Sequence, residues 1–434
     1  MNITGSYQSM FRIPELKRRI LFTAMILLVY RLGGHIPTPG INREALRAFF
    51  DAQSGTLMGL YDMFSGGGLR NATVFALGIM PYISASIILQ LLQTVVPYFE
   101  KMAKDGEAGR KKINELTRYG TVFLALIQSF GMAAGLEQMS GGIVLNPGFA
   151  FKIMTAITLT AGTVFVMWLG EQITERGIGN GISLIIFIGI VARYPADILN
   201  TFQQLRSGEM HIIKGLIIGV FMLAVVAGII AITQGQRKIP VQYAKKIVGR
   251  RSYGGANTHI PLKVNTAGVI PIIFAQSIIM FPATLTHLFP GNGFFETLGR
   301  IFNSPHPVYV ISYSALIILF AYFYTAVILN PVDLADNMKK NSGFIPGVRP
   351  GKKTAEYIDR VLSRVTLPGA VFLAVIAVLP DLLIKVFNVP FYFGGTGLLI
   401  VVGVALDTLQ QIESHLVMRH YDGFMTKGRL RARR

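Results

Sequence analysis

Side chains that hydrolyse substrates or bind metals form no recognisable pattern in this sequence of 434 residues. There is no His-Glu-x-x-His motif for zinc, and no serine lies in the Gly-x-Ser-Gly context of intramembrane serine proteases. The seven histidines lack the spacing of metal ligands, and cysteine is absent. These absences argue against a membrane enzyme, and we expect neither a metal nor a cofactor.

A nucleotide-binding loop is also missing. The segment GVRPGKK, residues 347–353, resembles a phosphate-binding loop, but that pattern requires glycine where Pro346 stands and serine or threonine where Lys353 stands. If this protein moves a substrate uphill, another protein must therefore hydrolyse the nucleotide. A secondary transporter is the alternative from composition alone, but such transporters keep midplane charges. Asp407 is the deepest candidate, and its position near Glu413 favours a structural carboxylate.

Isoleucines recur at helical spacing in two apolar segments. Ile79 and Ile83 are four residues apart and share a helix face, as do Ile182 and Ile186. A ring of such branched side chains can form a constriction in a pore that excludes water. The same spacing also fits isoleucines that face lipid or pack in a core, so the pattern alone leaves both interpretations open.

The elements that carry these residues are predicted to cross a membrane. The chain is 52% hydrophobic and 15% charged, whereas soluble domains are about 25% charged. Its long uncharged runs predict an all-α polytopic membrane protein. The basic start and the apolar run after it lack a small-x-small cleavage site, which predicts a retained first span. The ten predicted spans lie near residues 20–36, 74–96, 118–136, 150–170, 180–192, 212–233, 266–288, 308–330, 366–386 and 394–418.

The distribution of basic residues predicts the topology. The net charge is +19, and 31 of the 41 lysines and arginines lie in segments assigned to the inner side. Both termini are therefore expected in the cytoplasm. Five spans in each half, residues 1–200 and 201–434, predict two halves that are inverted relative to each other, with functional sites at their interface.

The segment from Leu57 to Gly68 is apolar but too short to cross about 30 Å of hydrocarbon. Three glycines end it. Backbone that stops within the membrane must be surrounded by protein or by a water-filled cavity. A short re-entrant plug helix is one interpretation, and a helix lying on the outer surface is the other.

Two inner loops, about residues 234–265 and 331–365, are longer than a connection between helices requires. The first combines alternating apolar residues with many cations, which predicts a projecting hairpin able to meet phosphates or an acidic protein surface. Positive-inside selection alone also explains the charge.

These segments together resemble the SecY family, the channel subunits of the bacterial Sec protein-translocation complex. The resemblance runs through essentially the whole chain. It rests on strings that include FSGGG, FALGIMPYISASII, GRKKINELTRYGT, MWLGEQITERGIGNGIS, QYAKKIVGRRSY, IPLKVNTAGVIPIIFAQS, FIPGVRPGKKT and VPFYFGGTGLLIVV. The extreme termini and the outer loop near 289–307 match no motif.

The resemblance implies an hourglass pore between the two halves and assigns residues to its parts. The pore ring maps onto Ile79, Ile83, Ile182, Ile186, Ile273 and Ile400. The plug would include Leu57, Leu60, Met63, Phe64, Gly66 and Gly67, and the lateral gate Gln90, Asn265 and Phe281. Partner docking would involve Arg250, Arg251 and Arg349.

The resemblance also implies what the protein does and with which partners. The expected function is a passive channel that passes unfolded secretory polypeptides and releases membrane segments sideways. The expected location is the bacterial inner membrane. The expected partners are the small subunits SecE and SecG, the motor ATPase SecA, the ribosome, signal sequences, secretory chains, anionic lipids and a second copy of the chain.

Overall fold

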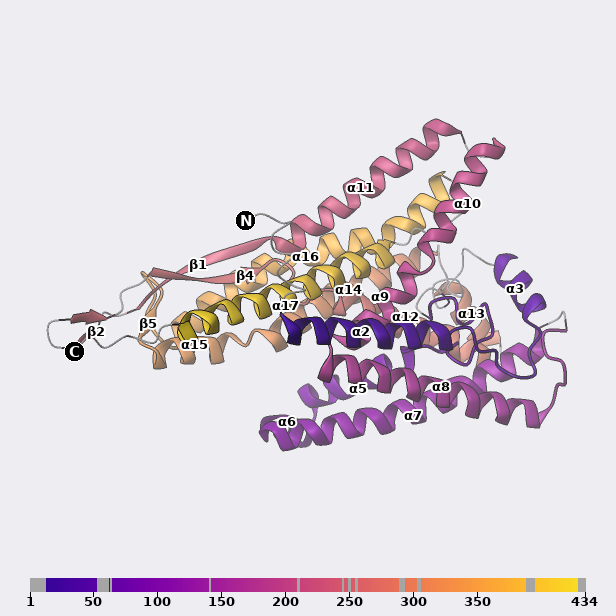
Figure 1. Cartoon of the computed structure of the whole chain (residues 1–434), viewed down its shortest axis with the longest axis horizontal. Coiled ribbons are helices and arrows are strands. Elements are labelled where there is room, and N and C mark those ends of the chain that lie inside the picture. Colours follow the sequence, from indigo (N-terminus) through magenta and orange to yellow (C-terminus); the bar gives the residue numbers. More distant parts are fainter. Residues whose placement is uncertain are drawn as a thin grey trace. The chain divides into compact units, whose positions relative to one another are not determined.

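The computed structural model describes residues 13–52, 62, 65–139, 142–208, 211–243, 246–248, 251–253, 257–288, 293–302, 306–387 and 395–427. Within these residues the chain is mostly helical, and it divides into two compact units (Figure 1). The first unit comprises Met1–Arg206, Met280–Arg300 and Ile400–Arg434. The second comprises Ser207–Ile279 and Ile301–Leu399.

A helix lies in each of the ten predicted spans. These helices are α2 (Pro14–Gly33), α5 (Met80–Val95), α7 (Gly106–Gln138), α8 (Phe149–Arg176), α9 (Gly181–Val191), α11 (Ile212–Gln234), α12 (Ile270–Leu288), α14 (Pro307–Ile328), α16 (Lys352–Phe387) and α17 (Gly395–Lys427). Among the described residues, seven helical segments are long and apolar enough to cross a membrane, or eight if one bent pair counts as a span. The all-α polytopic class is therefore confirmed.

Proline lies in the first turn of several helices and explains where they begin. It does so in α2, α5, α14, α6 (Pro97–Lys104) and α15 (Pro331–Lys340). The first turn tolerates proline because its N–H groups have no intrahelical partner. The second predicted span, 74–96, is corrected accordingly: α5 begins only at Met80, and the residues from Val74 to Ile79 form turns. Pro81 lies in the first turn of this helix, where it costs no intrahelical hydrogen bond.

The sharp bend near the second span lies at its end. Helices α5 and α6 meet at an angle of 98°. Val96 stands between them in an extended conformation, with φ −103° and ψ 117°, and Pro97 follows. A residue before proline avoids the helical region because the proline ring clashes with its backbone, so the helix must break at Val96.

In the first unit, α7 and α8 lie side by side as an antiparallel pair (Figure 1). Two ion pairs join α7 and α8, one near each end of their contact. Arg118 Nε lies 2.8 Å from Glu171 Oε1, and Lys152 Nζ lies 2.8 Å from Glu137 Oε2. The charged groups thus gather at the ends of the pair, where membrane helices carry them at least cost.

The apolar face of the short amphipathic helix α3 (Arg43–Ala52) packs against residues 65–79, the segment that leads into α5. Leu46 and Phe50, four residues apart, are buried in a cluster with Leu69 and Leu77. The same cluster includes Leu136 near the end of α7. This packing holds residues 65–79 in place beside α3.

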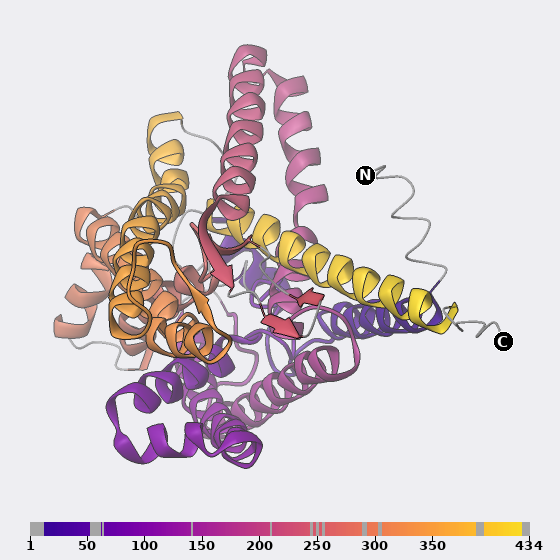
Figure 2. The same ribbon diagram turned by 90° about the vertical axis from the view of Figure 1, so that its left-hand side faces the viewer.

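In the second unit, α14 lies beside α16, and α15 packs on α16 as well (Figures 1 and 2). Close approach to α16 depends on small residues. A Cβ added at Gly369 would lie 3.1 Å from Val264 Cγ1, and a Cβ added at Gly228 of α11 would lie 3.3 Å from the ring of Phe372. These glycines let the helices and the chain before α12 pack against one another.

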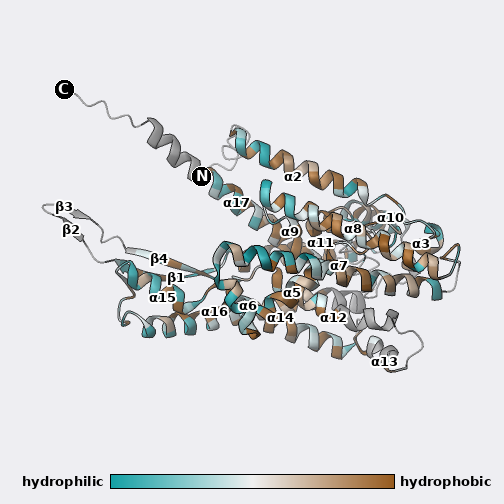
Figure 3. Cartoon of the chain, turned by 90° about the horizontal axis from the view of Figure 1, so that it is seen from below, coloured by the Kyte–Doolittle hydropathy of each residue, from teal (hydrophilic) through white to brown (hydrophobic). Residues whose placement is uncertain are grey.

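The predicted projecting hairpin is confirmed. Strands β1 (Gln236–Tyr243) and β4 (Asn257–Lys263) pair antiparallel with Ile239 opposite Ile260, and β5 (Gly343–Phe344) adds to β1. Beyond them β2 (Lys246–Val248) pairs with β3 (Arg251–Tyr253). Strands β2 and β3 lie at the end of the hairpin that is farthest from α11 (Figure 1), and hydrophilic residues are frequent along β1 and β4 (Figure 3).

The base of this hairpin is anchored by apolar side chains. Ile239 and Val241 alternate along β1 and therefore point to one face of the sheet. They are buried in a cluster with Met338 of α15 and Ile358 and Leu362 of α16. The base of the sheet is thus packed on α15 and α16 of its own unit.

Candidate functional site

The isoleucines of the second predicted span lie at the start of α5. Ile79 occupies the N-cap position, and its carbonyl oxygen accepts a hydrogen bond of 3.1 Å from the N–H of Ile83. Both side chains are buried, with exposed fractions of 1% and 4%. Because α5 begins here, the pair lies where turns give way to helix, and not in the middle of a continuous span.

The second isoleucine pair lies in the first two turns of α9, which is only 11 residues long. The Asn180 side chain caps this helix by accepting hydrogen bonds from the N–H groups of Ile182 at 3.1 Å and Ser183 at 3.2 Å. Ile186 is fully buried, and Ile182 is partly buried. A Cβ added at Gly170 of α8 would lie 3.3 Å from Ile182 Cγ1, so the start of α9 packs tightly on α8.

The loop before α9 is held by side chains from three helices. Thr23 of α2 accepts a hydrogen bond of 3.0 Å from the N–H of Ile178, and Gln411 of α17 accepts one of 2.9 Å from Gly179. Thr174 of α8 accepts one of 2.9 Å from the N–H of Gly181. The loop therefore does not depend on its own backbone for hydrogen bonds, and its position follows that of α2, α8 and α17.

The remaining predicted ring residues lie in different units. Ile400 of α17 belongs to the first unit and Ile273 of α12 to the second, with exposed fractions of 0% and 6%. All six predicted ring isoleucines are thus at least partly buried. The arrangement of the six as a ring stays a prediction.

The predicted gate residues are described in part. Gln90 lies on α5, and its Nε2 donates to Ser86 Oγ at 3.0 Å. Asn265 is buried in the turn before α12, with 7% of its surface exposed. Phe281 lies on α12, but its side chain is outside the described residues.

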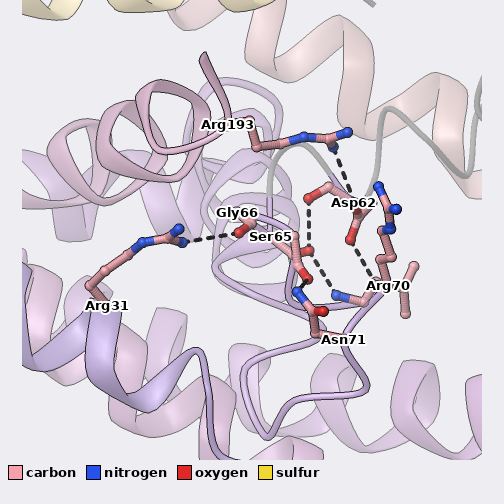
Figure 4. Close-up of polar contacts among 9 residues, drawn as sticks. Arg31, Asp62, Ser65, Gly66, Arg70, Asn71 and Arg193 are labelled. Carbon is pink, nitrogen blue, oxygen red and sulfur yellow. Dashed lines mark hydrogen bonds and ion pairs between the residues drawn. The ribbon is translucent and has the colours of Figure 1, made fainter. Parts of the chain in front are cut away.

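Of the predicted plug, Leu57, Leu60, Met63 and Phe64 lie outside the described residues. Asp62, which the sequence analysis did not single out, organises the described part (Figure 4). Its Oδ1 accepts a hydrogen bond of 2.8 Å from the N–H of Arg70, and its carbonyl accepts one of 2.8 Å from Gly67. Its Oδ2 lies 3.2 Å from Arg193 Nη1, in the turn between α9 and α10 (Tyr194–Ser207).

Asp62 is almost completely buried, with 2% of its surface exposed. It lies in the connection between the first two predicted spans. Burial raises the pKa of Asp62 above its ordinary value, and the guanidinium of Arg193 together with the N–H of Arg70 offsets part of that rise. A carboxylate in such a place requires a partner to stay charged.

Two glycines follow Asp62 with left-handed backbone angles, φ +67° at Gly66 and +83° at Gly67. A Cβ added at Gly66 would lie 3.0 Å from the Cα of Gly189, so this residue lies directly against α9. Arg31 of α2 donates from Nη1 to the carbonyl of Gly66 at 3.2 Å (Figure 4). The described part of the predicted plug thus contacts both α2 and α9.

Asn71 completes this network. Its Nδ2 donates to the carbonyl of Gly67 at 2.8 Å, while its Oδ1 accepts from Arg47 Nε and Nη2 at 2.9 and 2.7 Å. Arg47 comes from α3. Sequence reasoning missed this network because its members are scattered, although one signal was present: Asp62 is the single acidic residue in the apolar segment from Leu57 to Gly68.

The predicted docking residues lie on or near the β1–β4 hairpin of the second unit. Arg250 is outside the described residues, and Arg251 lies in β3 with its side chain outside them. Arg349 is exposed in the loop between β5 and α16, where its carbonyl accepts a hydrogen bond of 2.9 Å from Thr354 Oγ1. Other exposed basic residues of the second unit include Arg237, Lys238, Lys339, Lys340, Lys352 and Lys353.

Known proteins resemble this chain over nearly its whole length. The chain is 49% identical over 422 residues to the protein translocase subunit SecY of Escherichia coli strain K12, an alignment that covers 96% of this chain and 95% of that protein. It is also 49% identical over 427 residues to the protein of the same name in Halalkalibacterium halodurans, covering 96% and 98%.

Solved structures share the fold. One, described as the structure of a protein conducting channel, has a TM-score of 0.67 at 18% identity and covers 92% of this chain and 93% of its own. Another concerns the plug domain of SecY and the closed state of the channel, with a TM-score of 0.67 at 19% identity and 92% coverage of both chains. A third is Sec61 in a canine ribosome-channel complex, with a TM-score of 0.62 at 17% identity and coverage of 92% and 93%.

A family profile agrees with these relatives. The profile named SecY matches residues 73–409, which include the helices that carry all six isoleucines and the basic hairpin. With such a match and with relatives that are half identical from end to end, the chain belongs to the SecY family of protein translocase subunits.

Proposed function

We propose that this chain is a passive channel through which unfolded secretory polypeptides cross the membrane. The observation that carries this proposal is its 49% identity, over 96% of its length, to the translocase subunit of Escherichia coli. The channel has no nucleotide site of its own, and a partner supplies the energy.

The pore ring consists of Ile79, Ile83, Ile182, Ile186, Ile273 and Ile400. Support comes from the burial of the isoleucines at the starts of α5 and α9 and from the short length of α9. Branched apolar side chains close around a passing chain without hydrogen bonding to its backbone, and they exclude water when no chain is present. Such a ring seals by packing and releases its substrate readily.

The segment Leu57–Gly68 acts as the plug. Gln90, Asn265 and Phe281 belong to a lateral gate through which membrane segments leave for the lipid. Support for the plug comes from the network around Asp62, which fixes the end of this segment to α2 and α9. The halves 1–200 and 201–434 form the two sides of the pore.

The second unit, which carries the hairpin, docks either the motor ATPase SecA or the ribosome through Arg250, Arg251 and Arg349. The packed base of the hairpin and the exposed Arg349 support this, because a projecting cationic surface attracts phosphates and acidic proteins. One structural relative is described in a ribosome-channel complex. We further propose SecE, SecG, anionic lipids and a second copy as partners, the bacterial inner membrane as the location, and cytoplasmic termini.

Cross-linking tests the path directly, because the chain contains no native cysteine. A single cysteine replaces Ile186, and a secretory chain with its own cysteine is arrested during transit. We expect a disulfide between the two. The matched control is Phe123→Cys, on the exposed face of α7, where 66% of the side chain is accessible. Transit without a cross-link at residue 186, or with equal cross-linking at both positions, would place the path elsewhere.

A further inference from the structure

An ion pair between residues far apart in the sequence joins Asp62, in the described part of the predicted plug, to the end of α9. Asp62 Oδ2 lies 3.2 Å from Arg193 Nη1, and 131 residues separate the two. The carboxylate is 3% exposed, whereas the guanidinium is 30% exposed. Arg193 therefore reaches from the end of α9 into a buried position that Asp62 occupies (Figure 4).

Asp62 also organises the loop that follows it. Its carbonyl accepts hydrogen bonds from Gly67 N–H at 2.8 Å and from Ser65 Oγ at 3.0 Å, and its Oδ1 accepts from Arg70 N–H at 2.8 Å. Ser65 Oγ accepts in turn from Leu69 N–H at 3.2 Å. Asp62 and residues 65–70 are therefore joined by a closed set of hydrogen bonds. Among the residues that the structure describes, Arg193 is the charged side chain that ties Asp62 to the end of α9.

Arg193 links this contact to the proposed pore ring, because it follows α9, the helix that carries Ile186. Arg193 follows α9 directly, seven residues after Ile186, which corresponds to about 10 Å along a helix. A shift or tilt of α9 that widens the ring at Ile186 also displaces Arg193. Because the buried carboxylate loses its charged partner when Arg193 moves away, the ion pair favours the arrangement in which Asp62 and the end of α9 stay together.

We propose that Asp62 and Arg193 form a latch that holds Asp62 and the loop of residues 65–70 against α9 in the resting channel and separates when α9 moves to admit a polypeptide. This proposal rests on the channel function and on the plug assignment given above. Asp62 and Arg193 are positioning residues: they act through the plug and do not contact the translocating chain. The second tie, from Arg31 to the Gly66 carbonyl, holds the loop to α2 and not to α9.

The test measures ion conductance of the full chain, purified with its small membrane partners, in bilayers without substrate. Asp62→Asn keeps the shape and an acceptor for Arg70 N–H but removes the charge. Arg193→Met removes the charge but keeps the length, and Arg193→Lys restores the charge. We expect resting conductance to rise by on the order of tenfold in Asp62→Asn and Arg193→Met, and to stay near that of the unchanged protein in Arg193→Lys.

The double variant Asp62→Asn with Arg193→Met separates a shared interaction from two unrelated effects. If both residues act through one latch, the double variant leaks about as much as either single variant. The matched control is Glu137→Gln, which breaks the Lys152 ion pair at the end of α7 and α8, away from the loop, and should leave conductance unchanged. Multiplicative leaks in the double variant, equal leaks in Glu137→Gln, or tight single variants would overturn the latch.

Translocation of a secretory chain is measured on the same preparations. The unchanged protein must translocate, and the leaky variants should still do so because the latch is needed only at rest. If the unchanged protein fails to translocate, the proposed function is wrong. If it translocates while the single variants remain tight, the channel stands and only the latch is wrong.

Discussion

The hydroxyl of Thr23 in α2 accepts a hydrogen bond of 3.0 Å from the backbone N–H of Ile178, although 155 residues separate them. The same hydroxyl donates to the carbonyl of Arg19 at 3.0 Å. Thr23 is 6% exposed, so water cannot replace it freely. This contact, with that of Gln411, fixes the loop from which α9 and its isoleucines begin.

Replacing Thr23 with valine should destabilise the protein. Valine has a similar shape but no acceptor, so the N–H of Ile178 is left buried and unpaired. We expect the free energy of unfolding to fall by about 1–3 kcal/mol. Thermal unfolding in detergent measures the effect. The control is Thr158→Val on the exposed side of α8, where the change should be within about 0.5 kcal/mol. Equal shifts for both variants would contradict the assigned role of Thr23.

Gly66 should tolerate alanine less well than its neighbour. Both Gly66 and Gly67 have positive φ, so alanine strains the backbone equally at each. Only at Gly66 would the new Cβ press on α9, 3.0 Å from Gly189 Cα, whereas at Gly67 the nearest atom is Asn71 Nδ2 at 3.7 Å. Resting conductance in bilayers should therefore rise more in Gly66→Ala. The reverse order would show that the loop does not lie against α9.

Acidification of the predicted outer side should increase the resting leak. Proton uptake by Asp62 removes the charge that binds Arg193, and because burial raises the pKa of Asp62 the change begins above about pH 3.9, where a free aspartate titrates. Arg193 and Arg70 both face Asp62, and Asp197 faces the same two arginines. Conductance measured against outer pH should rise in the unchanged protein and stay flat in Asp62→Asn, which has no carboxylate at this position.

Acidification should affect folding stability and resting conductance differently: through Asp62 it favours the folded state, while it raises the leak. A raised folded-state pKa means that the folded protein binds the proton more tightly than the unfolded chain. The contribution of Asp62 to the free energy of unfolding is thus present below its ordinary pKa and is lost as the pH rises through the raised value. Leak on acidification without unfolding is the expected combination, and circular dichroism over the same pH range checks that the fold persists.

Reversing the charge of Arg349 should weaken the docking of a partner without unfolding the channel. The side chain is exposed, and its described contact is through the backbone carbonyl, which any residue retains. We expect slower translocation in a reconstituted assay for Arg349→Glu and normal thermal unfolding. Arg206→Glu, an exposed arginine on α10 at the predicted outer side, is the control and should translocate normally. Unchanged translocation in Arg349→Glu would remove Arg349 from the docking surface.

Local patterns predicted much of this fold. The uninterrupted apolar run of α11 is sufficient to predict a spanning helix, because a helix satisfies its own backbone hydrogen bonds in lipid. The alternation of apolar and basic residues around Ile239 predicted the hairpin that β1 and β4 form. The start of α5 was predicted too early, since Val74–Ile79 is as apolar as the helix after it and hydropathy does not distinguish a buried turn from a helix.

The sequence by itself thus determined the helical class, the positions of the ten apolar segments and the family. Only the tertiary structure decided that Asp62 pairs with Arg193, that Gly66 lies against Gly189, and that Thr23 and Gln411 hold the loop before α9. The physical reason is the distance along the sequence over which each kind of interaction acts. Hydropathy and helix periodicity act over a few neighbouring residues, whereas a buried polar group finds its partner wherever packing brings one, here more than a hundred residues away.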